Sequence, residues 1–150
     1  MSAEKKTNII FMDGKEKLLQ KLFAADCFGY LAVGYSGTED TNGFVNIDLE
    51  NDGEASDRGF IEIVDDTTYA RVPLNFESIC NRDDDNGKVT GRFTAELDLD
   101  NIISNIPINQ IAIVDSSERQ QDTTFFGASV VDTYTKNEKL SLVFVIEITI

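Results

Sequence analysis

The chain contains no histidine and no tryptophan among its 150 residues. Without histidine it lacks the Ser-His-Asp and Cys-His catalytic arrangements, the histidine general base and most catalytic zinc sites. Its two cysteines, Cys27 and Cys80, are too few for a structural zinc site or an iron–sulfur cluster. We therefore expect two reduced, half-buried thiols, no cofactor and no enzymatic activity.

Basic residues are scarce as well: 13 Lys and Arg stand against 27 Asp and Glu, so the net charge is −14. Lys and Arg supply most of the affinity for phosphate, so we predict no direct binding to nucleic acid and none to an anionic membrane. The apolar run Ile9–Met12 is far shorter than the roughly 20 residues of a membrane span. No secretory signal peptide is visible either.

The chain also has few features that divide a sequence into parts. Only two prolines occur, Pro73 and Pro107, and there is no low-complexity linker. A length of 150 residues fits one domain, since domains run to roughly 100–200 residues. Hydrophobic residues make up 41% of the chain, enough to form a core. We expect a single domain over residues 1–150, beginning with an N-terminal arm, residues 1–12.

One helix is expected, over about residues 13–26. Asp13 is placed to cap its N-terminus, and Glu16 follows three residues later, close to a capping box. Apolar residues then recur at helical spacing. They are Leu18, Leu19, Leu22 and Phe23.

Most of the remaining chain has the pattern of strands separated by polar turns. Pro73 lacks an N–H, so its strand should lie at a sheet edge or carry a bulge, and Asn86-Gly87 marks a tight turn. The expected strands are 28–35, 58–64, 68–76, 88–97, 108–114, 124–135 and 140–150. This order predicts a mainly β fold, a single antiparallel β-sandwich or jelly roll with one short N-terminal helix.

The last two strands have the clearest pattern. Residues 140–150 alternate between apolar side chains on one face and a mixed set that includes Val143 and Val145 on the other. A polar turn, residues 136–139, precedes them. We therefore expect 124–135 and 140–150 to form a terminal hairpin with one buried face and a second face that is partly covered.

One acidic stretch resembles the first half of a calcium loop. Asp48, Glu50 and Asp52 stand at the first, third and fifth positions, and Gly53 follows at the sixth. The twelfth position, where such loops need Glu, is Gly59. The sequence therefore favours a solvated acidic turn and no metal, with these three residues as a weak calcium candidate.

Five residues are candidates for protein–protein contact. Ile9, Ile10 and Phe11 form a short apolar run that is expected to add as a strand to a sheet edge, either of its own fold or of a neighbour. Tyr35 and Tyr69 lie in β-rich segments, where tyrosines serve as core edges or interface anchors.

The arrangement resembles small β-sandwich virion proteins of tailed bacteriophages. Tyr30-Leu-Ala-Val-Gly34, with Ser36–Thr41 behind it, is similar to their N-terminal segment, and Tyr69-Ala-Arg-Val-Pro-Leu74 to the following Arg-bearing strand. Asn109–Val114 and the alternating segment Lys139–Ile150 are similar to a middle and a C-terminal strand. No catalytic residues belong to this pattern.

The resemblance implies a structural subunit of the phage particle, made in the bacterial cytoplasm and located in the virion. It would be repeated by symmetry in the neck or tail, as part of a ring, a collar or a fibre attachment. Its partners would be copies of itself and portal, tail or capsid proteins. The alternatives are a capsid decoration protein and a carbohydrate- or host-surface-binding module of a fibre or baseplate.

Overall fold

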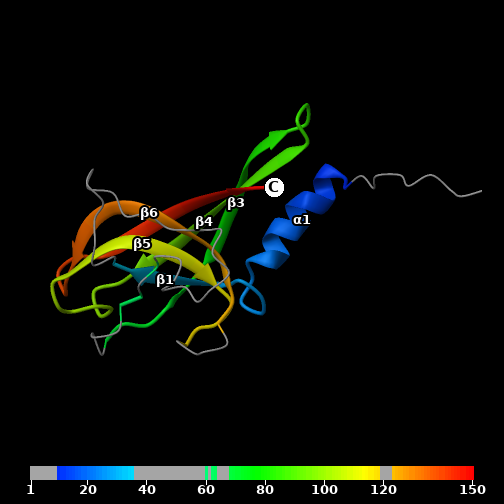
Figure 1. The fold of residues 1–150 in the computed structure, drawn as a ribbon. Helices are drawn as coiled ribbons and strands as arrows, with labels where there is room; N and C mark the ends of the chain where they lie inside the picture. The colour runs from blue at the N-terminus through cyan, green and yellow to red at the C-terminus, as the bar shows by residue number, and fades with distance from the viewer. Residues whose placement is uncertain (1–9, 36–59, 61, 64–67, 119–122) are drawn as a thin grey trace, which may run out of the picture.

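A computed structural model describes residues 10–35, 60, 62–63, 68–118 and 123–150 (Figure 1). The fold is mainly β, with two antiparallel sheets and one short helix, as the sequence predicts. The elements are α1 (Met12–Leu22), β1 (Tyr30–Gly34), β2 (Val72–Pro73), β3 (Asn75–Asp83), β4 (Lys88–Leu97), β5 (Ile106–Val114), β6 (Phe125–Lys136) and β7 (Leu142–Thr149). One sheet has the order β2-β1-β5-β6 and the other β3-β4-β7.

The helix differs from its prediction at both ends. The N-cap is Phe11, with no side-chain cap, and Asp13 lies in the first turn instead. The helix ends at Leu22, and the backbone then turns back. Gly29 allows this turn, because a Cβ there would lie 2.6 Å from the carbonyl oxygen of Ala24. The chain after the helix therefore packs closely on itself.

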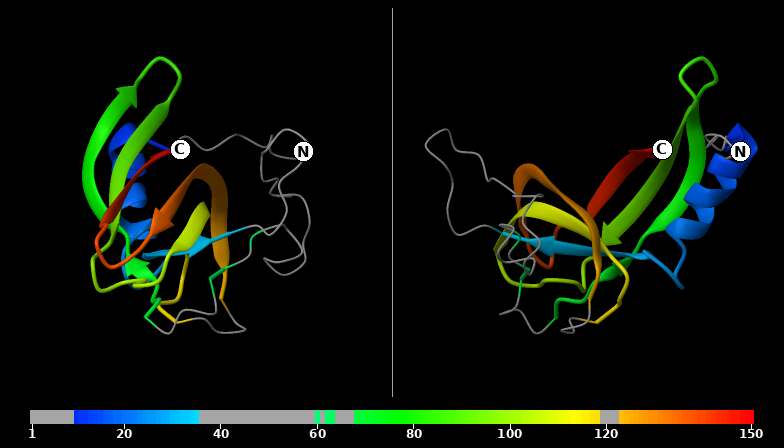
Figure 2. Two further views of the ribbon diagram at one scale, coloured as in Figure 1. Left: turned by 90° about the vertical axis from the view of Figure 1, so that its left-hand side faces the viewer. Right: turned by 45° about the vertical axis from the view of Figure 1, so that its right-hand side comes forward.

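The helix is fixed to the β3–β4 hairpin at both of its ends (Figure 2). Near its N-terminus, Arg82 of the hairpin forms an ion pair of 2.9 Å with Asp13, and Lys15 donates a hydrogen bond to the carbonyl of Gly87. Further along, Leu19 and Phe23 are buried in the core. Leu18, expected on the same apolar face, is exposed.

The core lies between the two sheets, with β5 at the centre of the larger one. The side chains of β5 from Ile108 to Val114 are buried on both faces. Phe60 covers part of the outer face, where it packs beside Ala112 and Val114. At one end of the sandwich, Phe23 makes edge-to-face contacts with Phe93 and Phe126. This aromatic contact joins the helix to both sheets.

Two local predictions about turns and edges are confirmed. Pro73 lies in β2, which is an edge strand of the larger sheet. Asn86-Gly87 lies in the turn between β3 and β4, and Gly87 has a φ of 65°. That left-handed conformation is accessible to glycine without a Cβ clash. The turn therefore allows the long β3–β4 hairpin to close.

The predicted terminal hairpin is wrong. β6 pairs with β5 in the larger sheet, whereas β7 pairs with β4 in the smaller one. The polar segment between them carries the chain from one layer of the sandwich to the other. Alternation shows which side chains of a strand face the core, and both arrangements satisfy it equally.

Candidate interaction surface

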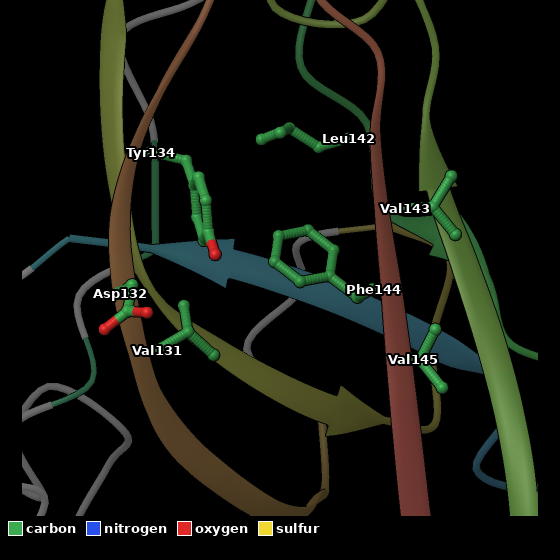
Figure 3. A pocket seen from close by; sticks show the side chains of 7 residues that line it. All are labelled: Val131, Asp132, Tyr134, Leu142, Val143, Phe144 and Val145. Atoms are coloured by element: carbon green, nitrogen blue, oxygen red, sulfur yellow. The ribbon is translucent and has the colours of Figure 1, made fainter.

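A cleft of about 550 Å³ lies between β6 and β7, where the chain changes sheets. Figure 3 shows Leu142 and Phe144 of β7 pointing toward β6, across from Val131 and Tyr134. The residues that line the cleft are Val131, Asp132, Tyr134, Leu142, Val143, Phe144 and Val145. Most of these side chains are apolar, so this opening exposes part of the space between the two sheets.

The two faces of β7 differ in exposure. Phe144 is buried, and Leu142 and Ile146 are half-buried. Val143 and Val145, on the opposite side of the strand in Figure 3, are 58% and 60% exposed. The second face was expected to be partly covered, and within the described residues these two valines are not. Their exposure leaves an apolar strip beside the cleft.

The backbone of β7 has an open side at the same place. Val89 and Ile150 exchange two backbone hydrogen bonds of 2.9 Å, and the register between β4 and β7 continues without a shift to Leu97 and Leu142. In an antiparallel ladder, hydrogen-bonded and non-hydrogen-bonded pairs alternate. The N–H and C=O groups of Val143 and Val145 therefore point away from β4, toward the open edge.

β6 forms the opposite wall of the cleft and is the edge strand of the larger sheet. Among the described residues it pairs with β5 alone. Tyr134 is 44% exposed, and Asp132 is exposed at the rim. The cleft is thus bounded by two sheet edges, each of which can accept a further strand.

The end of the N-terminal arm is a second exposed apolar feature. Ile10 is 59% exposed and Phe11 is 80% exposed, directly before α1. Ile9 lies outside the described residues. Figure 1 places the start of α1 at the end of the molecule opposite β6. Phe11 therefore offers a large apolar side chain that the described fold does not cover.

The two tyrosine candidates have different positions. Tyr35 is half-buried and lines a small cavity of about 100 Å³ with Ile63, Ile106 and Pro107. Tyr69 is 7% exposed and belongs to the core. Its hydroxyl can be buried there because it forms hydrogen bonds inside the fold. Of the two roles expected for these tyrosines, the burial of Tyr69 agrees with a place in the core.

A buried polar network surrounds Tyr69. Its hydroxyl donates to Glu62 at 2.6 Å and accepts from the backbone N–H of Val33 at 3.1 Å. Arg71 forms a two-pronged ion pair with the same Glu62 carboxylate, at 2.8 and 2.9 Å. Arg71 also donates to the carbonyls of Ser116 and Glu118.

This network is satisfied by its own members and therefore stabilises the fold. Burial, followed by the charge of Glu62, raises the pKa of Tyr69 well above its usual range. Burial alone would lower the pKa of Arg71, but its hydrogen bond and ion pair with Glu62 raise it. Both groups keep their protons at neutral pH, so neither is prepared to act as a general base.

Two further findings concern metal binding and membrane spanning in the described residues. No group of three or more Cys, Asp and Glu side chains is arranged to hold a metal ion in that part of the chain. Asp48, Glu50 and Asp52 lie outside it. Over the same residues, no helix is long and apolar enough to cross a membrane. Both cysteines are free: Cys27 is half-buried, and Cys80 is exposed rather than half-buried.

Sequence reasoning did not identify the cleft. Its residues come from two strands that were expected to pair, and paired strands leave no opening between them. The one available signal was Val143 and Val145, two valines on the outer face of the last strand. Comparisons with protein-family models, curated proteins and solved structures found no match.

Proposed function

We propose that this chain is a non-enzymatic structural subunit that associates with copies of itself in the virion of a tailed bacteriophage, in the neck or tail. The observation that carries the proposal is the open edge of β7, where Val143 and Val145 are 58% and 60% exposed. Natural proteins protect sheet edges with charges, prolines or covering loops, because an open edge pairs with other chains.

The chemistry of the surface also supports an assembly subunit. The apolar strip on β7 ends where Glu147 pairs with Arg92 at 2.9 Å, so charged side chains border the strip on that side. A polar rim around an apolar centre is the common organisation of protein interfaces. A net charge of −14 keeps such a subunit soluble before it assembles.

The placement in a phage particle is supported by the resemblance of four segments to small β-sandwich virion proteins. Three of these segments correspond to described strands: β1, β5 and β7. Symmetric contacts between different surfaces of identical subunits close into rings. The arm and the cleft are two such different surfaces.

Three measurements test this proposal. Light scattering of the purified full chain should give a mass that is a multiple of 16.7 kDa. Quantitative mass spectrometry of purified phage particles should find the chain at a fixed ratio to the portal protein, and immunogold labelling should place it at the neck or tail. A chain that is monomeric at all concentrations and absent from particles contradicts the proposal. Labelling of the capsid surface would favour the decoration alternative.

A second function, carbohydrate binding at a host surface, has one observation in its favour. Tyr134 and Asp132 are both exposed along the rim of the same cleft. An aromatic face beside a carboxylate suits a sugar, which presents both C–H and hydroxyl groups. Binding on a glycan array that is lost in Tyr134→Ala and kept in Tyr35→Phe would support this function. No binding to host polysaccharide would reject it.

A further inference from the structure

We propose that the cleft between β6 and β7 receives the N-terminal arm of a neighbouring copy, whose residues 7–11 add as a strand along β7. This inference rests on the proposed self-association and specifies which surfaces make it. Donation of a strand between subunits is an established way in which proteins associate. Three properties of the cleft and the arm support it.

The first property is the backbone of β7. Val143 and Val145 direct their N–H and C=O groups away from β4, because the hydrogen-bonded pairs of that ladder fall on Leu142 and Phe144. An incoming extended segment therefore finds two donors and two acceptors at the spacing of a strand. An arm strand would extend the three-stranded sheet to four.

The second property is the alternation of the arm. In an extended segment, Ile9 and Phe11 lie on one face and Ile10 on the other. Directed inward, Ile9 and Phe11 would fill the cleft of about 550 Å³ between Phe144 and Tyr134. Ile10 would then lie beside the exposed strip of Val143 and Val145. Both apolar faces of the arm thus find an apolar surface.

The third property is charge. Residues 1–12 contain two Lys and one Glu, which gives 2 − 1 = +1. The other 138 residues contain 11 basic and 26 acidic residues, which gives 11 − 26 = −15. Among the described residues, Asp132 is the one charged residue that lines the cleft. The basic arm is therefore attracted to the acidic body, which favours the arm over an acidic segment as the occupant.

The geometry favours exchange between copies. Arg82 and Gly87 hold the first turn of α1 against the β3–β4 hairpin, which fixes the position of Phe11 at the start of the helix. Figures 1 and 2 place this end of α1 away from β6. A copy that donates its arm to the next and receives one from the previous makes a head-to-tail contact, which forms rings or filaments.

The first experiment introduces a charge at the open edge of the full chain. Val145→Lys places a cation where the arm strand would pair, and Lys is a residue that protects natural edges. We expect self-association in analytical ultracentrifugation to weaken by about tenfold or more. The matched control is Leu99→Lys, at an exposed leucine (51%) that lies outside the cleft. Equal association of the two variants would overturn the proposal.

The second experiment locates the arm directly. It tests the contact between arm and cleft even where Val145→Lys destabilises the fold. Phe11 is replaced by the photo-crosslinking residue benzoyl-phenylalanine in a mixture of ¹⁴N- and ¹⁵N-labelled full chains. We expect mixed-isotope crosslinks from position 11 to residues 131–134 or 142–145. Oligomers crosslinked elsewhere, or within one chain, would overturn the arm-in-cleft contact and leave the proposed function intact. A monomer without intermolecular crosslinks would overturn both.

Discussion

At the scale of single residues, Arg71 joins more parts of the chain than any other side chain described above. Its guanidinium contacts the Glu62 carboxylate and the carbonyls of Ser116 and Glu118, and also the hydroxyl of Thr123 at 3.1 Å. It thereby ties the chain just before β2 to the segment between β5 and β6. Because each donor has an acceptor, the charge is accommodated inside the fold.

Removing this guanidinium should be costly. We expect Arg71→Ala to lower the free energy of unfolding by about 3–5 kcal/mol, because Glu62 is left as an unpaired, largely buried charge. Urea denaturation measures the change. Arg92→Ala is the control, since its ion pair with Glu147 is exposed and should contribute little. An equal loss of the free energy of unfolding in the two variants would show that the Arg71 network stabilises the fold no more than the exposed Arg92–Glu147 pair does.

Tyr69 gives an expectation for alkaline pH. Its pKa is raised in the folded chain by burial and by Glu62, whereas an unfolded tyrosine releases its proton near pH 10. The protonated Tyr69 therefore makes its full contribution to the free energy of unfolding below about pH 10. This contribution is lost as the pH rises further. Denaturation measurements below and above about pH 10 should show this fall in the free energy of unfolding. Tyr69→Phe should reduce it, and an unchanged slope in that variant would contradict this assignment.

At the scale of elements, β7 has one face that belongs to the core and another side that is open to other chains. Its inner face contributes Phe144 to the main core cluster. Its outer face carries the exposed Val143 and Val145, and its open backbone edge borders the cleft. One strand can serve both functions because successive side chains along it point to opposite faces.

The two faces should respond differently to truncation. Phe144→Ala is expected to lower stability by about 3 kcal/mol or more, because it leaves a cavity against the larger sheet. Val145→Ala, one residue further, should change the stability of the monomer by less than about 0.5 kcal/mol. Thermal denaturation of both variants at low concentration provides the comparison. A costly Val145→Ala would mean that the outer face is covered.

The N-terminal arm can be tested as an element of its own. Deleting residues 2–10 should leave a folded domain, because Ile10 is 59% exposed and α1 begins only at Met12. We expect the Tm to stay within about 2–4 °C of the full chain. Circular dichroism monitors the melt, and, for the virion subunit proposed above, complementation of a phage deletion monitors incorporation into particles. Normal incorporation would show that the arm is dispensable, and loss of folding would show that it belongs to the core.

Strands were easier to predict than their partners. The predicted strand 88–97 matches β4 residue for residue, and Pro73 lies at a sheet edge as expected. The hairpin of the last two strands was wrong, because alternation fixes the inward face and leaves the neighbouring strand undetermined. The Arg71–Glu62 pair could not be predicted, since it joins residues whose proximity depends on how β2 packs. The cleft was not predicted for the same reason, because it lies between the two strands that were expected to pair.

At the scale of the whole molecule, the excess of 14 negative charges is distributed over turns as well as strands. The β3–β4 hairpin carries Asp83, Asp84 and Asp85 around its turn. Hydrogen bonds from the Asn86 side chain and backbone lower the pKa of Asp83, so this carboxylate stays charged in mildly acidic solution. Repulsion among such groups opposes non-specific aggregation.

The acidic composition does not by itself make a calcium site. We expect millimolar calcium to leave the Tm unchanged, because the segment with Asp48, Glu50 and Asp52 lacks the twelfth-position Glu. A ligand that binds only the folded state would raise the Tm by mass action. Differential scanning fluorimetry with and without chelator measures this. A rise of several degrees that disappears in Asp48→Ala would contradict the expectation.

The pairing of β1 with β5 affects how the chain folds as it is synthesised. Tyr30 of β1 lies opposite Val114 of β5, so the central pair of the larger sheet joins segments from distant parts of the chain. At translation rates of about 5–20 residues per second, β1 waits on the order of ten seconds for its partner. During that interval its apolar Leu-Ala-Val sequence is exposed to other nascent chains. The larger sheet therefore cannot close around its central pair until β5 has left the ribosome.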